Sequence, residues 1–235
     1  MKTALALRTG EETQSKSEQM KVHTPVLAAA LIGWSSLAHA QVELSFYGGI
    51  QSALDSDVTI RDDDAIANQS FNQAWDGRSF EAPIYYGLRV TRWQDSAFGY
   101  GLEFNHAKVY PRNDELPAGF ERLELTDGIN TLTANAYYRW DSLLGEVTPY
   151  VGGGLGLAIP HVEVITEESR TFGYQVTGPA ATFIAGARMP IADRWSVFGE
   201  YKGTFSSNEA DLDTGGTFEA DIVTNAINVG VSFDF

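Results

Sequence analysis

The 235-residue chain contains no cysteine and few basic residues, and both shortages restrict its chemistry. Without cysteine it can form no disulfide, no thiolate nucleophile and no cysteine-based metal site. Its 16 lysines and arginines stand against 31 aspartates and glutamates, a net charge of −15, which makes nucleic acid an unsuitable partner. An anionic lipid surface is not excluded, because divalent cations can bridge carboxylates and phosphates.

The apolar run near the start of the chain, residues 25–34, is too short to cross a membrane as a helix. It is preceded by Lys21 and followed by Ala38-His39-Ala40. A basic start, a short apolar segment and an Ala-x-Ala site together predict a secretory signal peptide over residues 20–40, cut before Gln41.

Residues 1–19 contain three glutamates and fit no part of a signal peptide. We interpret them as a mis-assigned N-terminal extension, with translation starting at Met20. The predicted mature protein is then one domain, residues 41–235. Export makes the missing disulfides informative, because the exported fold must close by other means.

The last eight residues alternate between apolar and polar side chains and end on an aromatic residue. The apolar face of this segment would carry Val229, Val231, Phe233 and Phe235. A two-residue period is that of a β-strand. A terminal aromatic closing such a strand resembles the signal read by the outer-membrane assembly machinery, so we expect that machinery as a partner during biogenesis and the bacterial outer membrane as the location.

Eight segments of this kind alternate with turn signals. They cover roughly residues 42–52, 84–93, 98–110, 131–140, 148–164, 174–189, 195–205 and 221–235. The long connections between them are 53–83, 111–130, 165–173 and 206–220, and the other connections are short. Alternating long external loops and tight periplasmic turns predict an all-β fold, an eight-stranded antiparallel up-and-down transmembrane β-barrel. Four aromatic residues beside the short turns predict a periplasmic girdle, namely Trp93, Trp140, Trp195 and Phe235.

The second face of these strands is polar and charged, and it must lie inside if the apolar face meets lipid. It carries Glu43, Gln51, Arg89, Glu103, Asn105, Asn135, Arg139, Arg188, Glu200, Lys202 and Asn228. Charges of both signs can pair in such an interior. A soluble lipocalin-like barrel would need an apolar interior and a polar exterior, the opposite of this pattern. A general porin does not fit either, because the interior of an eight-stranded barrel is filled by side chains and leaves no channel.

The mature chain has two histidines, His106 and His161, at the outer ends of two predicted strands. Each lies two residues from a charged group, Lys108 or Glu163. Strict alternation puts both imidazoles on the lipid-facing side, where their side chains diverge and one shared metal is difficult to hold. A bulge near Pro160 would turn His161 inward. Two interpretations stay open: interfacial polar residues, or a base or divalent metal site.

Four short segments resemble the outer-membrane lipid A oxidase family, within the OmpA-like class of eight-stranded barrels. They are 106–110 (HAKVY), 160–164 (PHVEV), 198–204 (FGEYKGT) and 224–231 (TNAINVGV). The resemblance implies an enzyme that uses O2 to convert the proximal glucosamine of 1-dephospho lipid A into 2-aminogluconate, with release of H2O2. It also implies lipid A, or lipopolysaccharide, in the outer leaflet as the partner, and we expect a monomer.

The sequence contains no flavin or nicotinamide motif, so an O2-dependent reaction would need a metal or unusual substrate activation. The candidate catalytic residues are His106, His161, Glu163, Glu200 and Lys202. His106, His161 and Glu163 are also the candidate metal ligands. Lys108 and Arg170 are candidates for holding the anionic groups of the substrate. Glu200 and Lys202 point into the predicted interior, as do Glu103 and Arg89. A structural salt-bridge network that fills a narrow barrel is therefore the competing interpretation for Glu200 and Lys202.

Other functions remain open from the sequence. A non-enzymatic OmpA-like barrel agrees with the charged interior and the missing motifs. A deacylase or palmitoyl transferase would need a serine–histidine pair, and an adhesin would use the acidic external loops.

Overall fold

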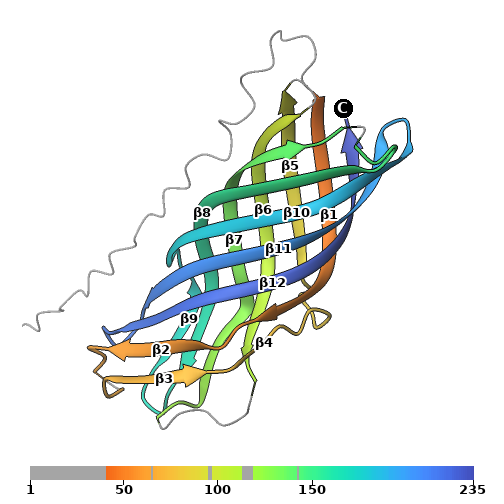
Figure 1. Ribbon diagram of the computed structural model, residues 1–235. Helices are drawn as coiled ribbons and strands as arrows, with labels where there is room; N and C mark the ends of the chain where they lie inside the picture. Colours follow the sequence, from red (N-terminus) through yellow and green to blue (C-terminus); the bar gives the residue numbers. More distant parts are fainter. Residues whose placement is uncertain (1–40, 65, 95–96, 113–118, 142) are drawn as a thin grey trace, which may run out of the picture. The chain divides into compact units, whose positions relative to one another are not determined.

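The computed structural model describes residues 41–64, 66–94, 97–112, 119–141 and 143–235, without the side chains of residues 126 and 127. The predicted extension and signal peptide lie outside these residues. The described chain consists of strands (Figure 1). They are β1 (Gln41–Ala53), β2 (Ser56–Arg61), β3 (Gln69–Gln73), β4 (Trp75–Asp76), β5 (Tyr86–Gln94), β6 (Phe98–Pro111), β7 (Arg122–Arg139), β8 (Thr148–Ile165), β9 (Arg170–Tyr174), β10 (Gly178–Ala192), β11 (Trp195–Asp211) and β12 (Thr217–Asp234). Within this part of the chain, no helix is long and apolar enough to cross a bilayer.

Eight of these strands form a closed antiparallel ring in the order β1-β5-β6-β7-β8-β10-β11-β12, and β12 pairs with β1 to complete it. The closing ladder runs from Glu43↔Asp234 to Ala53↔Thr224, so the C-terminal strand is paired along most of its length. The amide of Phe235 extends it by donating to the carbonyl of Val42 at 2.9 Å. The prediction of an all-β, eight-stranded antiparallel fold is confirmed. Closure satisfies the backbone groups that an open sheet edge would leave unpaired.

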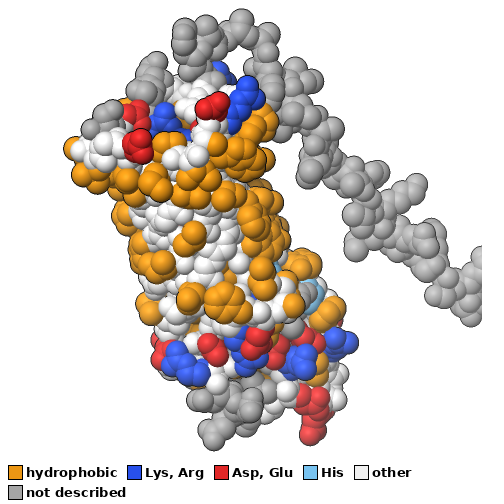
Figure 2. All heavy atoms as spheres, turned by 90° about the vertical axis from the view of Figure 1, so that its right-hand side faces the viewer, with side chains coloured by type: hydrophobic (Ala, Val, Ile, Leu, Met, Phe, Trp, Pro, Cys, Tyr) orange, Lys and Arg blue, Asp and Glu red, His pale blue; other side chains and the backbone are white. Residues whose placement is uncertain are grey.

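The two faces of the ring strands differ as the alternation predicts. Outward residues are apolar and exposed, and they include Leu44, Phe46, Leu88, Val90, Leu102, Leu132, Leu155, Phe183, Ile227 and Val229. Inward residues are polar and buried, and they include Glu43, Arg89, Glu103, Asn135, Glu200, Lys202 and Asn228. Figure 2 shows the outward apolar side chains as a band, with charged side chains gathered beyond it.

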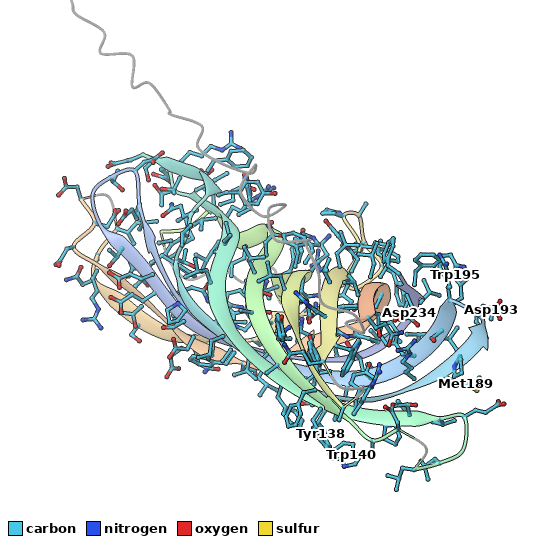
Figure 3. All side chains as sticks on the ribbon, turned by 90° about the horizontal axis from the view of Figure 1, so that it is seen from above. Tyr138, Trp140, Met189, Asp193, Trp195 and Asp234 are labelled. Atoms are coloured by element: carbon cyan, nitrogen blue, oxygen red, sulfur yellow. The ribbon has the colours of Figure 1, made fainter. Side chains whose placement is uncertain are left out.

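The end of the ring that carries the short turns is rich in exposed aromatic residues. Trp140, Trp195 and Phe235 are exposed there, as the predicted girdle requires, and Figure 3 shows Tyr138, Trp140 and Trp195 at this end. The prediction for Trp93 is wrong. Trp93 is buried and its Nε1 donates to Glu43 at 3.0 Å, because it shares the inward phase of Arg89.

The opposite end, here called the loop end, contains strands that the sequence did not predict. The expected loop 53–83 holds β2, β3 and β4, and the expected loop 165–173 holds most of β9. The connection between β11 and β12 shrinks to residues 212–216. Two of these short strands depend on partners that are distant in sequence, since β2 pairs with the outer part of β12 and β4 with the end of β6.

At the loop end the barrel interior changes from polar to apolar. At this end, strands β2, β3, β11 and β12 lie opposite strands β6 to β9 (Figure 1). Buried apolar side chains of the loop end form one cluster. The cluster includes Val58, Ile60, Val109, Leu123, Leu125, Ile129, Val162, Val164, Leu212, Phe218 and Ile222. The loop end is therefore held together by a core of the kind found in soluble β-proteins.

Between β9 and β11 a side chain replaces part of the backbone ladder. The side-chain amide of Gln175 donates through Nε2 to the backbone carbonyl of Asp211, and its Oε1 accepts from the backbone N–H of Asp211, both at 2.9 Å. We expect Gln175→Ala to speed hydrogen exchange of the Asp211 amide by about fivefold, which corresponds to about 1 kcal/mol for the hydrogen bond that protects this amide. Exchange in the β1–β12 ladder is the internal control, and an unchanged Asp211 rate would show that Gln175 does not hold this edge.

Candidate functional site

The two histidines lie on the outward side of the barrel near the loop end. The alternation that exposes Leu102 continues along β6 to His106, and the one that exposes Leu157 continues along β8 to His161. Strand β7 lies between β6 and β8. The segments 106–110 and 160–164 are thus neighbours across one strand, where the apolar band meets charged side chains. Figure 2 shows histidine atoms at that border.

His106 is held in one orientation. Its ring stacks on Tyr86, with centroids 5.5 Å apart, and its Nδ1 lies 2.8 Å from Oδ1 of Asn130. The amide nitrogen of Asn130 donates to the carbonyl of Ile159 at 3.3 Å, which turns Oδ1 toward the ring. Nδ1 therefore carries the proton, and Nε2 is left as an acceptor with no hydrogen-bond partner among the described residues.

His106 and His161 are both covered by neighbouring groups. They are 4% and 5% exposed, whereas strict alternation on a bare lipid-facing surface predicts exposed rings. His106 is covered partly by the β7 bulge, since a Cβ on Gly128 would lie 3.0 Å from its Cε1. The rings of Phe172 and Tyr174 pack edge-on against the ring of His161, with centroid distances of 4.4 and 4.7 Å. His161 is therefore covered by strand β9, which the sequence pattern did not lead us to expect.

Glu163 lies beside His161 on the outward phase of β8 and joins two arginines. Its carboxylate accepts hydrogen bonds from Arg122 and Arg170, each at 3.1 Å. The carboxylate is buried, whereas the side chains of Arg122 and Arg170 are 48% and 57% exposed. The hydrogen bond and the charge of Glu163 raise the pKa of Arg122. Arg170 also lies over the ring of Phe172, 4.4 Å from its centroid.

The candidate metal ligands His106, His161 and Glu163 do not come together. In the part of the chain that the structure describes, no three histidine, aspartate or glutamate side chains gather as a metal-binding group. The intervening strand β7 keeps the two imidazoles apart on a convex surface. The geometry supports separate roles for His106 and for the pair of His161 and Glu163.

Lys108 points into the protein. Its ammonium donates to the carbonyls of Glu81 and Ala82 at 3.0 and 3.1 Å, and the side chain is fully buried. The β6–β7 register shifts between Ala107 and Val109, so simple alternation does not hold here. This position favours a structural role for Lys108 over contact with a substrate anion.

Glu200 and Lys202 belong to a charge network in the barrel interior. Arg89 bonds both oxygens of Glu200, at 2.8 and 3.0 Å, and donates to Glu103 at 3.0 Å. Lys202 pairs with Glu103 and donates to Tyr47 at 3.0 Å. Further donors to these carboxylates are Tyr137, Tyr150, Asn135 and Asn228. The geometry supports the network interpretation for these two residues, which lie away from the outward surface.

Sequence reasoning missed Arg122, Asn130, Phe172 and Tyr174. All four were assigned to loops or to their edges. The alternation in residues 170–174, Arg-Thr-Phe-Gly-Tyr, was a usable signal for β9. No local signal predicted that Arg122 pairs with Glu163, because that contact depends on the register of β7 and β8.

One family model and several solved structures resemble this chain. The family model "Outer membrane protein beta-barrel domain" matches residues 26–235. Similar solved structures include neisserial surface protein A (12% identity, 83% of this chain and 97% of that chain, TM-score 0.46) and the outer membrane protein AlkL (14%, 92% and 97%, 0.48). Another is the N-terminal β-barrel domain of Pseudomonas aeruginosa OprF (14%, 84% and 100%, 0.42).

Among curated proteins none matches the sequence. The family match covers most of the chain. The chain therefore belongs to the outer membrane protein β-barrel family and resides in the outer membrane.

Proposed function

We propose that this barrel is an enzyme that oxidises lipid A in the outer leaflet, at the outward surface around His106 and His161. The observation that carries the proposal is the position of these histidines at the border of the apolar band, where a lipid headgroup meets the protein. The resemblance of the segments 106–110 and 160–164 to the lipid A oxidase family supplies the reaction.

The reaction removes two electrons from the proximal sugar. In 1-dephospho lipid A, C1 of that sugar carries a free hemiacetal hydroxyl. Its oxidation transfers the hydrogen on C1 with both electrons, together with the hydroxyl proton, to O2. The products are H2O2 and a lactone, which water opens to the aminogluconate. O2 is thus the co-substrate, and its activation calls for a metal or an activated substrate.

His106 is the best base in this scheme. Asn130 keeps the proton on Nδ1, so Nε2 is ready to accept the hydroxyl proton of the sugar. The β7 bulge at Gly128 packs on the ring, and access for a sugar requires this bulge to move. His161 and Glu163 then serve as neighbours that shape the headgroup surface.

A mass spectrum of lipid A tests the proposal. Membranes that supply 1-dephospho lipid A and contain the protein should show a gain of one oxygen atom on the proximal sugar, absent without O2. His106→Gln should lower this conversion by about 100-fold or more, the usual contribution of a general base. The variant must keep the heat-modifiable electrophoretic shift of a folded barrel. Full conversion by a folded His106→Gln protein would exclude His106 as the base.

The second candidate is a non-enzymatic surface barrel. It is favoured by the cover over both imidazoles and by an interior in which the charges are paired. An unchanged lipid A spectrum from a folded barrel would support this candidate over the oxidase.

A further inference from the structure

The outward face of β9 and its neighbours forms a graded surface, here called the β9 surface. It consists of Arg122, Arg170, Phe172, Tyr174 and Val176. The alternation of β9 places Arg170, Phe172 and Tyr174 on the same side, facing Ile165, Glu163 and His161 of β8. Phe172, Tyr174 and Val176 are exposed, although they are apolar or aromatic. Arg122 lies across β8, opposite Ile165.

The order of these residues follows the order of groups in a membrane lipid. Tyr174 at the end of β9, and Val176 just after it, lie toward the ring strands and their apolar band, whereas Arg170 lies at the far end of β9, at the loop end. The apolar and aromatic part of this surface suits acyl chains, and the arginine part suits the anionic groups of a lipid headgroup. The gradient continues the apolar band without interruption, because Leu157 is exposed on the adjoining part of β8.

The two arginines keep donors available. Each guanidinium has five N–H groups, and each donates to one oxygen of the same buried carboxylate, Glu163. Glu163 fixes their position, while about half of each side chain remains exposed. Two guanidiniums held side by side are suited to a shared phosphate or carboxylate. Arg122 also lies 4.0 Å from Glu124 through its Nε.

We infer that the β9 surface binds one anionic glycolipid of the outer leaflet, with its phosphate or carboxylate on Arg122 and Arg170. Its acyl chains lie along Phe172, Tyr174 and Val176. The identity of this lipid as lipid A rests on the proposed function. The binding surface itself depends on the geometry of β7, β8 and β9.

Binding can be measured on the full barrel in nanodiscs of neutral phosphatidylcholine, with fluorescent lipid A as the probe. We expect the double variant Arg122→Gln/Arg170→Gln to weaken binding by about tenfold or more, as expected for two lost charge-assisted contacts. Arg61→Gln is the matched control, because Arg61 is equally exposed and pairs with Glu219 on a different part of the barrel. Phe172→Ser with Tyr174→Ser should weaken binding of acylated lipid A and spare its deacylated headgroup.

Equal binding by wild type and the double arginine variant would overturn the inference, as would an equal loss in Arg61→Gln. Displacement of the probe by inorganic phosphate alone at the same concentration would also overturn it, since the site would then recognise a free anion. The outcomes separate the two proposals. Oxidation that persists without binding to the β9 surface removes this inference, and binding without any oxidation removes the oxidase proposal.

Discussion

Replacing Glu103 by alanine should lower the free energy of unfolding by about 3–5 kcal/mol, the usual cost of removing one partner from a buried ion pair. Glu103 is fully buried and accepts from Arg89, Lys202 and Tyr47. Without it, the ammonium of Lys202 remains in the interior with no carboxylate beside it, whereas Arg89 keeps Glu200. Urea unfolding of the barrel in lipid vesicles measures the change.

The matched control for this change is Glu219→Ala. Glu219 pairs with Arg61 at 3.1 Å on the surface of the loop end, where such a pair contributes about 0–1 kcal/mol. The double variant Glu103→Met/Lys202→Met should lose less than the sum of the single variants, because it removes both charges together. A loss for Glu103→Ala no larger than that for Glu219→Ala would show that the interior network is solvated.

Replacing Leu155 by arginine should destabilise the inserted barrel by about 2–4 kcal/mol, because an outward charge near the bilayer midplane must leave water. Leu155 is 73% exposed and lies among the outward apolar residues of β8. On a soluble protein the same change at so exposed a position would be close to neutral. Unfolding in vesicles again measures the change.

Leu144→Arg provides the comparison at similar exposure. Leu144 is 62% exposed and lies in the turn between β7 and β8, at the interface end, where the cost falls to about 0–1 kcal/mol. If the two leucine variants lost equal stability, the apolar band would not mark the hydrocarbon layer.

Alternation along the ring strands was enough to predict which side chains point in and which point out. Glu103, Arg89, Glu200 and Lys202 were predicted inside from that period alone, and the structure confirms it. The period is informative in these strands because the outward face is apolar and meets lipid, whereas the inward face is polar and meets polar partners. Trp93 shows that residue type and a position beside a turn are not enough to predict the girdle. Its place in the alternation of β5 puts its side chain inside the barrel.

The loop end could not be predicted in this way. Strands β2 and β4 are short and pair with segments that are distant in sequence, so no local period was strong enough to mark them, whereas residues 170–174 of β9 do alternate and pair with the neighbouring β8. The cover over His161 follows from β9, and the arginine pair on Glu163 follows from the β7–β8 register. The burial of Lys108 was not visible in the sequence either, because it depends on a bulge in the β6–β7 ladder and on the carbonyls of Glu81 and Ala82.

By itself, the sequence determined the strand count of the ring, its outward and inward faces, and hence a barrel that places apolar side chains against lipid. Only the tertiary structure decided what surrounds each histidine, which cations face outward, and that the loop end has an apolar core. The physical reason is that alternation is a property of one strand, whereas cover, ion pairing and core formation depend on which strands meet and in which register.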